Sequence, residues 1–253
     1  MITLSTKDWK IENIDTILFD KDGTLIDSHI YWGEIIKRRA MALIYSTNIS
    51  TTKYDELCLT MGLDINTGKL LPDGPIALVS REKVIEILID YFDNNGAVVY
   101  PVDIATTFDK VHLIFNQEAY KYINLIQGSI EFVKAVKQQG VKTAIVTSDT
   151  VENTKAFLDY YNINNLFDCI VGKETTIQSK DTGVPAIYAI EELGSLFSNS
   201  ISIGDAPIDI QMANNAFMKA GIGVATGQIK TEELKIHTNY VCNLLSEITI
   251  EVK

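Results

Sequence analysis

From about residue 129 onward, short apolar runs alternate with stretches of helical periodicity, and this alternation constrains the fold more than any other feature. Apolar, β-branched runs predict strands, and the amphipathic stretches between them predict helices. We expect strands at 141–147, 170–172, 200–204, 220–225 and 240–242. We expect helices at 130–139, 151–161, 184–193 and 208–216. Such alternation predicts an α/β fold, a doubly wound parallel sheet with helices on both faces.

The region between residues 28 and 128 has a different pattern. It is mostly helical in periodicity and lacks convincing parallel strands; helices are expected at 31–45, 53–61, 80–92 and 106–122. An insertion of about a hundred residues must bury its own apolar faces, which indicates a second, smaller domain. We therefore expect a Rossmann-like core of residues 1–27 and 129–253, with an all-helical cap domain of residues 28–128. The two connections between the cap domain and the core, near residues 27–28 and 127–129, are expected to lie side by side, an arrangement that suits a hinged lid.

Near the N-terminus, the apolar run 17–19 ends in two carboxylates, Asp20 and Asp22, with Gly23 and Thr24 directly after them. An apolar run bounded by Asp and Gly predicts a buried parallel strand that ends in a loop. In open α/β sheets, ligands bind at the carboxyl ends of the strands. Two acids crowded at such a place repel each other and favour a bound cation or a shared proton.

Three later segments place polar groups at equivalent positions of the predicted sheet. One strand runs into Thr147 and Ser148 before a helix, where free backbone N–H groups favour an anion. Lys180 precedes another helix, and a further apolar strand ends in Asp205, with Asp209 four residues on. Carboxylate oxygens suit a hard cation such as Mg²⁺. Each segment alone is also explained by a turn, an N-cap or a surface lysine, but their joint occurrence in this order is far more specific.

Composition excludes several classes of function. The hydrophobic content of 46% and charged content of 22% are typical of a soluble globular protein. A net charge of −11 argues against nucleic acid and against anionic membrane surfaces as partners. No apolar run approaches the roughly 18 residues needed to span a bilayer, and no signal peptide is evident. The three cysteines have no metal-type spacing, so we expect reduced thiols and a cytoplasmic protein.

These motifs together resemble those of the haloacid dehalogenase superfamily, in the phosphatase branch with a helical cap, and most closely the phosphoglycolate phosphatase-like group. The first family motif, Asp-x-Asp-x-Thr, is matched by Asp20, Asp22 and Thr24. The second is matched by Thr147. The third is matched by Lys180, with Lys173 as the alternative. The fourth, Gly-Asp-x-x-x-Asp, is matched by Gly204, Asp205 and Asp209.

The resemblance implies a Mg²⁺-dependent phosphatase that hydrolyses a small phosphorylated metabolite through an aspartyl-phosphate. It implies that Asp20 is the nucleophile and Asp22 the general acid/base. It also implies that Thr24, Thr147, Ser148 and Lys180 bind the phosphoryl group. The implied Mg²⁺ ligands are Asp20, Asp205 and the backbone carbonyl of Asp22, with Asp209 coordinating directly or through water.

Two other functions remain open at this stage. A phosphomutase of the β-phosphoglucomutase type would keep the aspartyl-phosphate from water and return the phosphoryl group to a sugar. An inactive relative would serve as a binding or regulatory module, although every catalytic position is present. Substrate choice is expected from the cap, where Arg38 or Arg81 could pair with a substrate carboxylate. The oligomeric state is open between a monomer and a homodimer.

Overall fold

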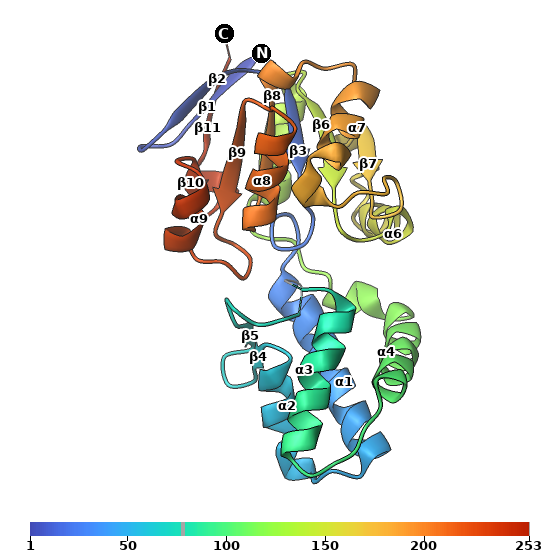
Figure 1. Cartoon of the computed structure of the whole chain (residues 1–253). Helices are drawn as coiled ribbons and strands as arrows, with labels where there is room; N and C mark the ends of the chain where they lie inside the picture. Colours follow the sequence, from blue (N-terminus) through green and yellow to red (C-terminus); the bar gives the residue numbers. More distant parts are fainter. Residues whose placement is uncertain (77–78, 253) are drawn as a thin grey trace. The chain divides into compact units, whose positions relative to one another are not determined.

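The structure is a computed structural model that describes residues 1–76 and 79–252. Its contacts divide the chain into two compact units (Figure 1). The first unit contains Met1–Asp27 and the described chain from Leu125 onward, and the second contains Ser28–Asn124. Each unit has its own cluster of buried apolar side chains, so each is described separately.

A six-stranded parallel sheet forms the centre of the first unit, as the sequence predicts. The strand order is β10-β9-β8-β3-β6-β7. The strands are β3 (Thr16–Phe19), β6 (Lys142–Val146), β7 (Cys169–Val171), β8 (Ser200–Gly204), β9 (Ala220–Val224) and β10 (Val241–Cys242). From β3 the chain builds outward to β6 and β7 on one side, then to β8, β9 and β10 on the other. The strand order therefore reverses beside β3, where doubly wound folds bind their ligands.

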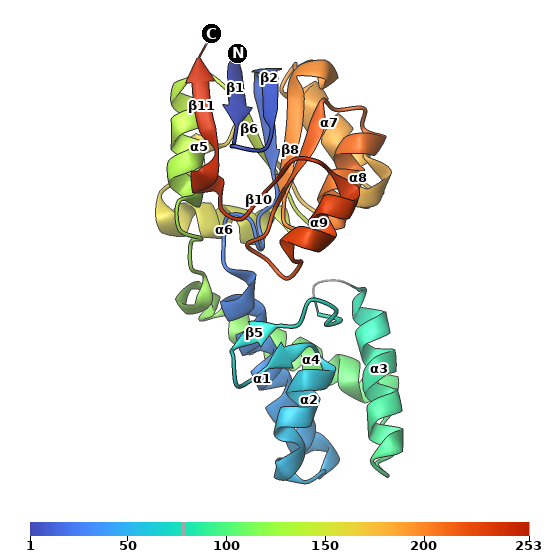
Figure 2. The same ribbon diagram turned by 90° about the vertical axis from the view of Figure 1, so that its left-hand side faces the viewer.

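Helices cover both faces of this sheet (Figure 2). They are α5 (Ser129–Gln138), α6 (Val151–Tyr161), α7 (Val184–Glu192), α8 (Pro207–Asn215) and α9 (Thr231–His237). Neighbouring residues of β3 show the two-sided burial. Leu18 belongs to the apolar cluster made with α7 and α8. Phe19, on the opposite face, meets Phe132 of α5 edge-to-face at 6.3 Å. Because both faces are covered, the strands read as continuous apolar runs.

A small antiparallel sheet in the first unit was not predicted. It has the order β11-β1-β2, with β1 (Ile2–Ser5), β2 (Lys10–Ile14) and β11 (Thr249–Val252). It brings the two ends of the chain together (Figure 1). Ile2 and Leu4 are fully buried, so this sheet adds apolar surface to the core.

The second unit is mainly helical, with α1 (Ser28–Thr47), α2 (Tyr54–Thr60), α3 (Arg81–Asn94) and α4 (Pro101–Asn116). It also contains an antiparallel pair, β4 (Leu63–Asp64) and β5 (Lys69–Leu70), so the expectation of an all-helical insert was incomplete. Gly68, with φ of +68°, makes the tight turn between these strands possible. The predicted helix 106–122 instead begins at Pro101, a residue suited to the first helical position. It ends at Asn116 and is followed by a separate 3₁₀ turn at Ala119–Tyr122.

The second boundary of the insert lies earlier than expected. Residues 125–128, assigned to the cap from the sequence, hydrogen-bond to the segment that follows β3. Leu125 forms an antiparallel bridge with Ile26, and the N–H of Ile126 donates to the Leu25 carbonyl at 3.0 Å. The Ser129 hydroxyl donates to the same carbonyl. These bonds tie residues 125–128 to the first unit.

Within the described part of the chain, none of the helices combines the length and apolar character needed to cross a membrane.

Leu18→Ala should lower the free energy of unfolding of the first unit by about 2–5 kcal/mol, because the side chain is fully buried under α7 and α8. Urea unfolding followed by tryptophan fluorescence in a Trp32→Phe background measures this change. Trp9, in the first unit, is then the remaining tryptophan. Leu196→Ala is the matched control, since Leu196 is 63% exposed and should change stability by less than about 0.5 kcal/mol. Equal losses in the two variants would contradict the assigned core.

Candidate active site

The central strand β3 delivers Asp20 to the carboxyl edge of the sheet. Phe19 is in register with Ile145 of β6 and with Ile203 of β8. The N–H of Asp20 continues the ladder by donating to the Ile203 carbonyl at 2.9 Å. The backbone of Asp20 is therefore fixed by the neighbouring strand, and its side chain is only 10% exposed.

The sequence after Asp20 folds into a tight loop. The carbonyl of Lys21 accepts hydrogen bonds from the N–H groups of Leu25 and Ile26 at 2.9 and 3.1 Å. Gly23 has φ of +86°, a conformation that favours glycine. A Cβ at this position would also lie 2.3 Å from Oδ2 of Asp205. The glycine is needed for the backbone conformation and for room beside Asp205.

Three buried carboxylates meet at this edge. Ligand oxygens of Asp20, Asp205 and Asp209 all lie within 4.8 Å of one another. Asp205 directly follows β8, and Asp209 lies in the first turn of α8, where its Oδ2 accepts the Ala206 N–H at 3.2 Å. That bond satisfies one of the backbone N–H groups at the start of the helix that have no carbonyl partner within the helix.

Glycines make the space that the acids occupy. A Cβ at Gly204 would lie 2.2 Å from Cγ of Asp209. A Cβ at Gly227 would lie 1.7 Å from Oδ2 of Asp205. Next to it, the Thr226 hydroxyl donates to the Gly23 carbonyl at 2.5 Å and joins this loop to the loop after β3. Thr226 and Gly227 were not identified from the sequence, because neither belongs to a charged motif.

Lys180 is the cation of this cluster. Its Nζ donates to Oδ1 of Asp20, and to Oδ1 of Asp209 at 2.8 Å. Lys180 is 6% exposed, whereas Lys173, the alternative considered from the sequence, is exposed. A hydrogen bond from Asn215 at the end of α8 to the Asp181 carbonyl, at 2.6 Å, holds the short 3₁₀ turn that carries Lys180.

The charges of this cluster are unbalanced. Burial alone would lower the pKa of Lys180, but attraction by Asp20 and Asp209 outweighs burial and holds it above its usual value. Burial and repulsion by Asp20 and Asp209 raise the pKa of Asp205 well above its ordinary range. Burial also raises the pKa of Asp20, although Lys180 opposes the shift. An all-oxygen group of acids with surplus negative charge fits a hard divalent cation.

Three of the predicted phosphoryl-binding residues, Thr24, Thr147 and Ser148, come after the adjacent strands β3 and β6. Thr24 is fully buried, and its hydroxyl lies 3.5 Å from Oδ1 of Asp205. Thr147 directly follows β6, the neighbour of β3, and is 4% exposed. Its hydroxyl accepts the N–H of Asp149 at 3.1 Å. Ser148 is exposed.

Asp22 is held apart from the three clustered acids. Both of its carboxylate oxygens contact Nζ of Lys21, at 3.1 and 3.2 Å, and the same ammonium group reaches Asp149 at 2.9 Å. Neither Lys21 nor Asp149 was predicted from the sequence to have a role in the site. The sequence shows that Lys21 lies between two acids of the first motif, but it does not show that Lys21 contacts Asp149, which comes after the neighbouring strand β6.

The two cap arginines considered for substrate recognition are both paired within the second unit. Arg38 forms ion pairs with Glu34 and Glu118, at 2.8 and 2.5 Å. Arg81 pairs with Asp109 at 2.7 Å. Both guanidinium groups therefore already have a carboxylate partner within the second unit.

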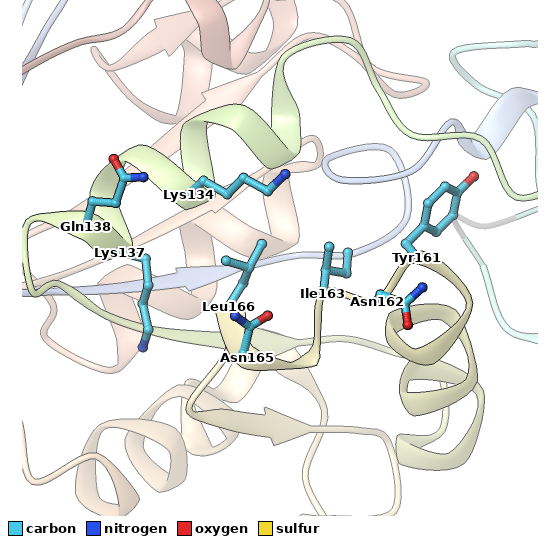
Figure 3. Close-up of a pocket in the computed structure, with 8 residues that line it drawn as sticks. All are labelled: Lys134, Lys137, Gln138, Tyr161, Asn162, Ile163, Asn165 and Leu166. Carbon is cyan, nitrogen blue, oxygen red and sulfur yellow. The ribbon is translucent and has the colours of Figure 1, made fainter.

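A surface cavity of about 500 Å³ lies elsewhere on the first unit, beside α5 and the end of α6 (Figure 3). It is lined by Lys134, Lys137, Gln138, Tyr161, Asn162, Ile163, Asn165 and Leu166. None of the motif residues lines it, so it is separate from the acidic cluster.

Comparison with known proteins identifies the class that this fold and site define. A family model described as haloacid dehalogenase-like hydrolase matches residues 14–216. The chain therefore belongs to the haloacid dehalogenase-like hydrolase family, as the motifs indicated.

Individual relatives of this chain have phosphatase and pyrophosphatase names. A phosphoglycolate phosphatase of Aquifex aeolicus is 31% identical over 209 residues, which cover 82% of this chain and 84% of that protein. The pyrophosphatase PpaX of Halalkalibacterium halodurans is 26% identical, with 83% of each chain covered. The fold matches a crystal structure of a predicted phosphoglycolate phosphatase from Haemophilus somnus, with a TM-score of 0.72. That match covers 94% of this chain and 97% of the other, at 18% identity.

Asp205→Asn should separate two effects of the buried acids, which are destabilisation of the metal-free protein by repulsion and stabilisation by bound Mg²⁺. Without metal, the variant should be at least as stable as the wild type, because it removes one of the mutually repelling carboxylates. Mg²⁺ at about one hundred times its dissociation constant should stabilise the wild type by about 2.7 kcal/mol, and the variant much less at the same concentration. Thermal unfolding with and without Mg²⁺ measures both effects. Asp8→Asn, at an exposed acid of the same unit, is the control. An unchanged response to Mg²⁺ in Asp205→Asn would contradict the metal site.

Proposed function

We propose that this hydrolase is a Mg²⁺-dependent phosphatase that acts on a small phosphorylated metabolite through an aspartyl-phosphate on Asp20. The observation that carries the proposal is the meeting of Asp20, Lys180, Asp205 and Asp209 at the carboxyl edge beside the central strand. The phosphoglycolate phosphatase and pyrophosphatase names of the relatives support phosphate chemistry.

In the first half of the reaction, an oxygen of Asp20 attacks the phosphorus, and the bond from phosphorus to the ester oxygen breaks. Asp22 donates its proton to the departing oxygen, so an alcohol leaves. Lys180 lies against the attacking carboxylate and carries the positive charge needed beside an anionic phosphoryl group.

In the second half, water attacks the phosphorus of the aspartyl-phosphate, and Asp22 accepts the proton of that water. The bond between phosphorus and Asp20 then breaks, which releases inorganic phosphate and restores the carboxylate. One residue acts as acid and then as base, as two-step transfer requires.

The metal ligands proposed are the carboxylates of Asp20 and Asp205, the backbone carbonyl of Asp22, and Asp209 directly or through water. Mg²⁺ held by these residues would neutralise negative charge that otherwise opposes attack by Asp20 on an anionic phosphoryl group. Asp209 also holds Lys180, which places the cation and the acids in one hydrogen-bonded group.

The remaining phosphoryl contacts are assigned to Thr24, Thr147 and Ser148. Thr147 and Ser148 follow β6 and precede α6, so backbone N–H groups near a helix start accompany their hydroxyls. A small phosphorylated molecule is the proposed partner. A cytoplasmic location and a monomer or homodimer stay predictions from the sequence.

A Mg²⁺-dependent screen of small phosphorylated metabolites tests the proposal. The screen should include phosphoglycolate, inorganic pyrophosphate, sugar phosphates and nucleoside monophosphates, compared by kcat/KM. Phosphate release in a single turnover separates the phosphatase from a phosphomutase, which would isomerise a sugar phosphate faster than it releases phosphate. No hydrolysis of any ester, aryl phosphates included, would favour an inactive binding relative.

Asp20→Asn should reduce phosphatase turnover by at least about a thousandfold, because the amide is a poor nucleophile and keeps the volume of the side chain. Phosphate release from p-nitrophenyl phosphate measures turnover, and circular dichroism with thermal unfolding checks the fold. Asp8→Asn should leave turnover unchanged. Substantial turnover by pure Asp20→Asn would remove Asp20 as the nucleophile.

A further inference from the structure

Lys21 is a buried cation that the proposed reaction does not use. Its side chain is 4% exposed, although lysine is among the residues least often buried. Its Nζ lies 3.1 Å from Oδ2 and 3.2 Å from Oδ1 of Asp22, and 2.9 Å from Oδ2 of Asp149. Lys21 therefore links the loop after β3 to the loop after β6.

Asp149 is itself firmly held. Its Oδ1 accepts hydrogen bonds from the Thr150 N–H at 2.7 Å and from Nδ2 of Asn153 at 2.8 Å. Its own N–H donates to the Thr147 hydroxyl at 3.1 Å. The anchor for Lys21 is thus fixed by two hydrogen bonds to the start of α6 and by one to Thr147, which follows β6. Thr150, and not Asp149, is the N-cap of α6, so the Asp149 side chain is available to Lys21.

Asp22 has less support of its own. Its side chain is 22% exposed, and Lys21 contacts both of its oxygens. A carboxylate that lost this contact would gain rotamer freedom and contact with water. Proton transfer depends on the donor lying within hydrogen-bond reach of the reacting oxygen, so such freedom would slow it.

We propose that Lys21 is a positioning residue that holds the Asp22 carboxylate for proton transfer, with Asp149 as its anchor. This inference rests on the proposed function, in which Asp22 protonates the leaving group. A purely structural role, in which Lys21 only joins two loops, is the competing explanation.

The dependence of rate on the leaving group distinguishes these roles. An ester with a good leaving group needs little help from an acid, whereas an ester with a poor leaving group needs it strongly. A series of p-nitrophenyl, phenyl and p-methoxyphenyl phosphates varies this need while keeping the phosphoryl group constant. We expect Lys21→Met to lower kcat/KM for phenyl phosphate roughly tenfold more than for p-nitrophenyl phosphate.

Three further variants make the test independent of the folding of Lys21→Met. Asp149→Asn keeps Lys21 beside Asp22 but removes the anchoring charge, and it should steepen the leaving-group dependence in the same direction. Lys21→Arg retains a cation and should restore part of the loss. Asn153→Ala, at a partly exposed residue of α6, removes a single bond to Asp149 and should give a milder effect of the same sign.

Lys137→Met is the matched control, because Lys137 forms an ion pair with Asp168 in the same unit, away from the acids. Its leaving-group dependence should equal that of the wild type. An equal loss for all three esters in Lys21→Met and Asp149→Asn, or no loss in either, would overturn the positioning role. Failure of the wild type to hydrolyse any of the esters would instead overturn the proposed function.

Discussion

The ion pair between Lys180 and two aspartates is the interaction on which the candidate site depends. Nζ of Lys180 reaches Asp20 from β3 and Asp209 from α8, so one ammonium group joins parts of the chain far apart in sequence. A buried ion pair of this kind is weak evidence for stability, since desolvation of the charges opposes their attraction. The burial of these charges at the carboxyl edge of the sheet is better explained by the phosphoryl chemistry proposed for them.

The strands of the main sheet could be predicted because most of them are buried on both faces and form short, mainly apolar runs. The small sheet at the chain ends could not. β2 has only two buried residues, Ile11 and Ile14, and β1 pairs with β11 at the opposite end of the chain. Pairing of that kind depends on tertiary proximity, which has no local signal. The β4–β5 pair was missed for a related reason, since its strands are two residues long.

Much of the candidate site could be predicted because its charged groups follow strand ends or precede helices. Asp20 and Asp205 directly follow strands, and Lys180 precedes α7. Asp209 lies in the first turn of α8, and all four residues converge in the structure. The partners of Lys21 could not be predicted. A lysine beside two acids is ordinarily a solvated surface group, and its contact with Asp149 depends on the register of β3 against β6. The glycines at 204 and 227 matter for the room they leave, a property visible only once the acids are in place.

The charge balance also limits how an anionic substrate can bind. Five carboxylates lie at this edge, but their ion pairs involve two ammonium groups, those of Lys21 and Lys180. The carboxylates are those of Asp20, Asp22, Asp149, Asp205 and Asp209. A phosphate ester brought to this edge would meet surplus negative charge, in a chain whose net charge is −11. A divalent cation on the acids would lower that surplus from three negative charges to one. Phosphate affinity and metal affinity are therefore expected to be linked, with each ligand strengthening the binding of the other by the same factor.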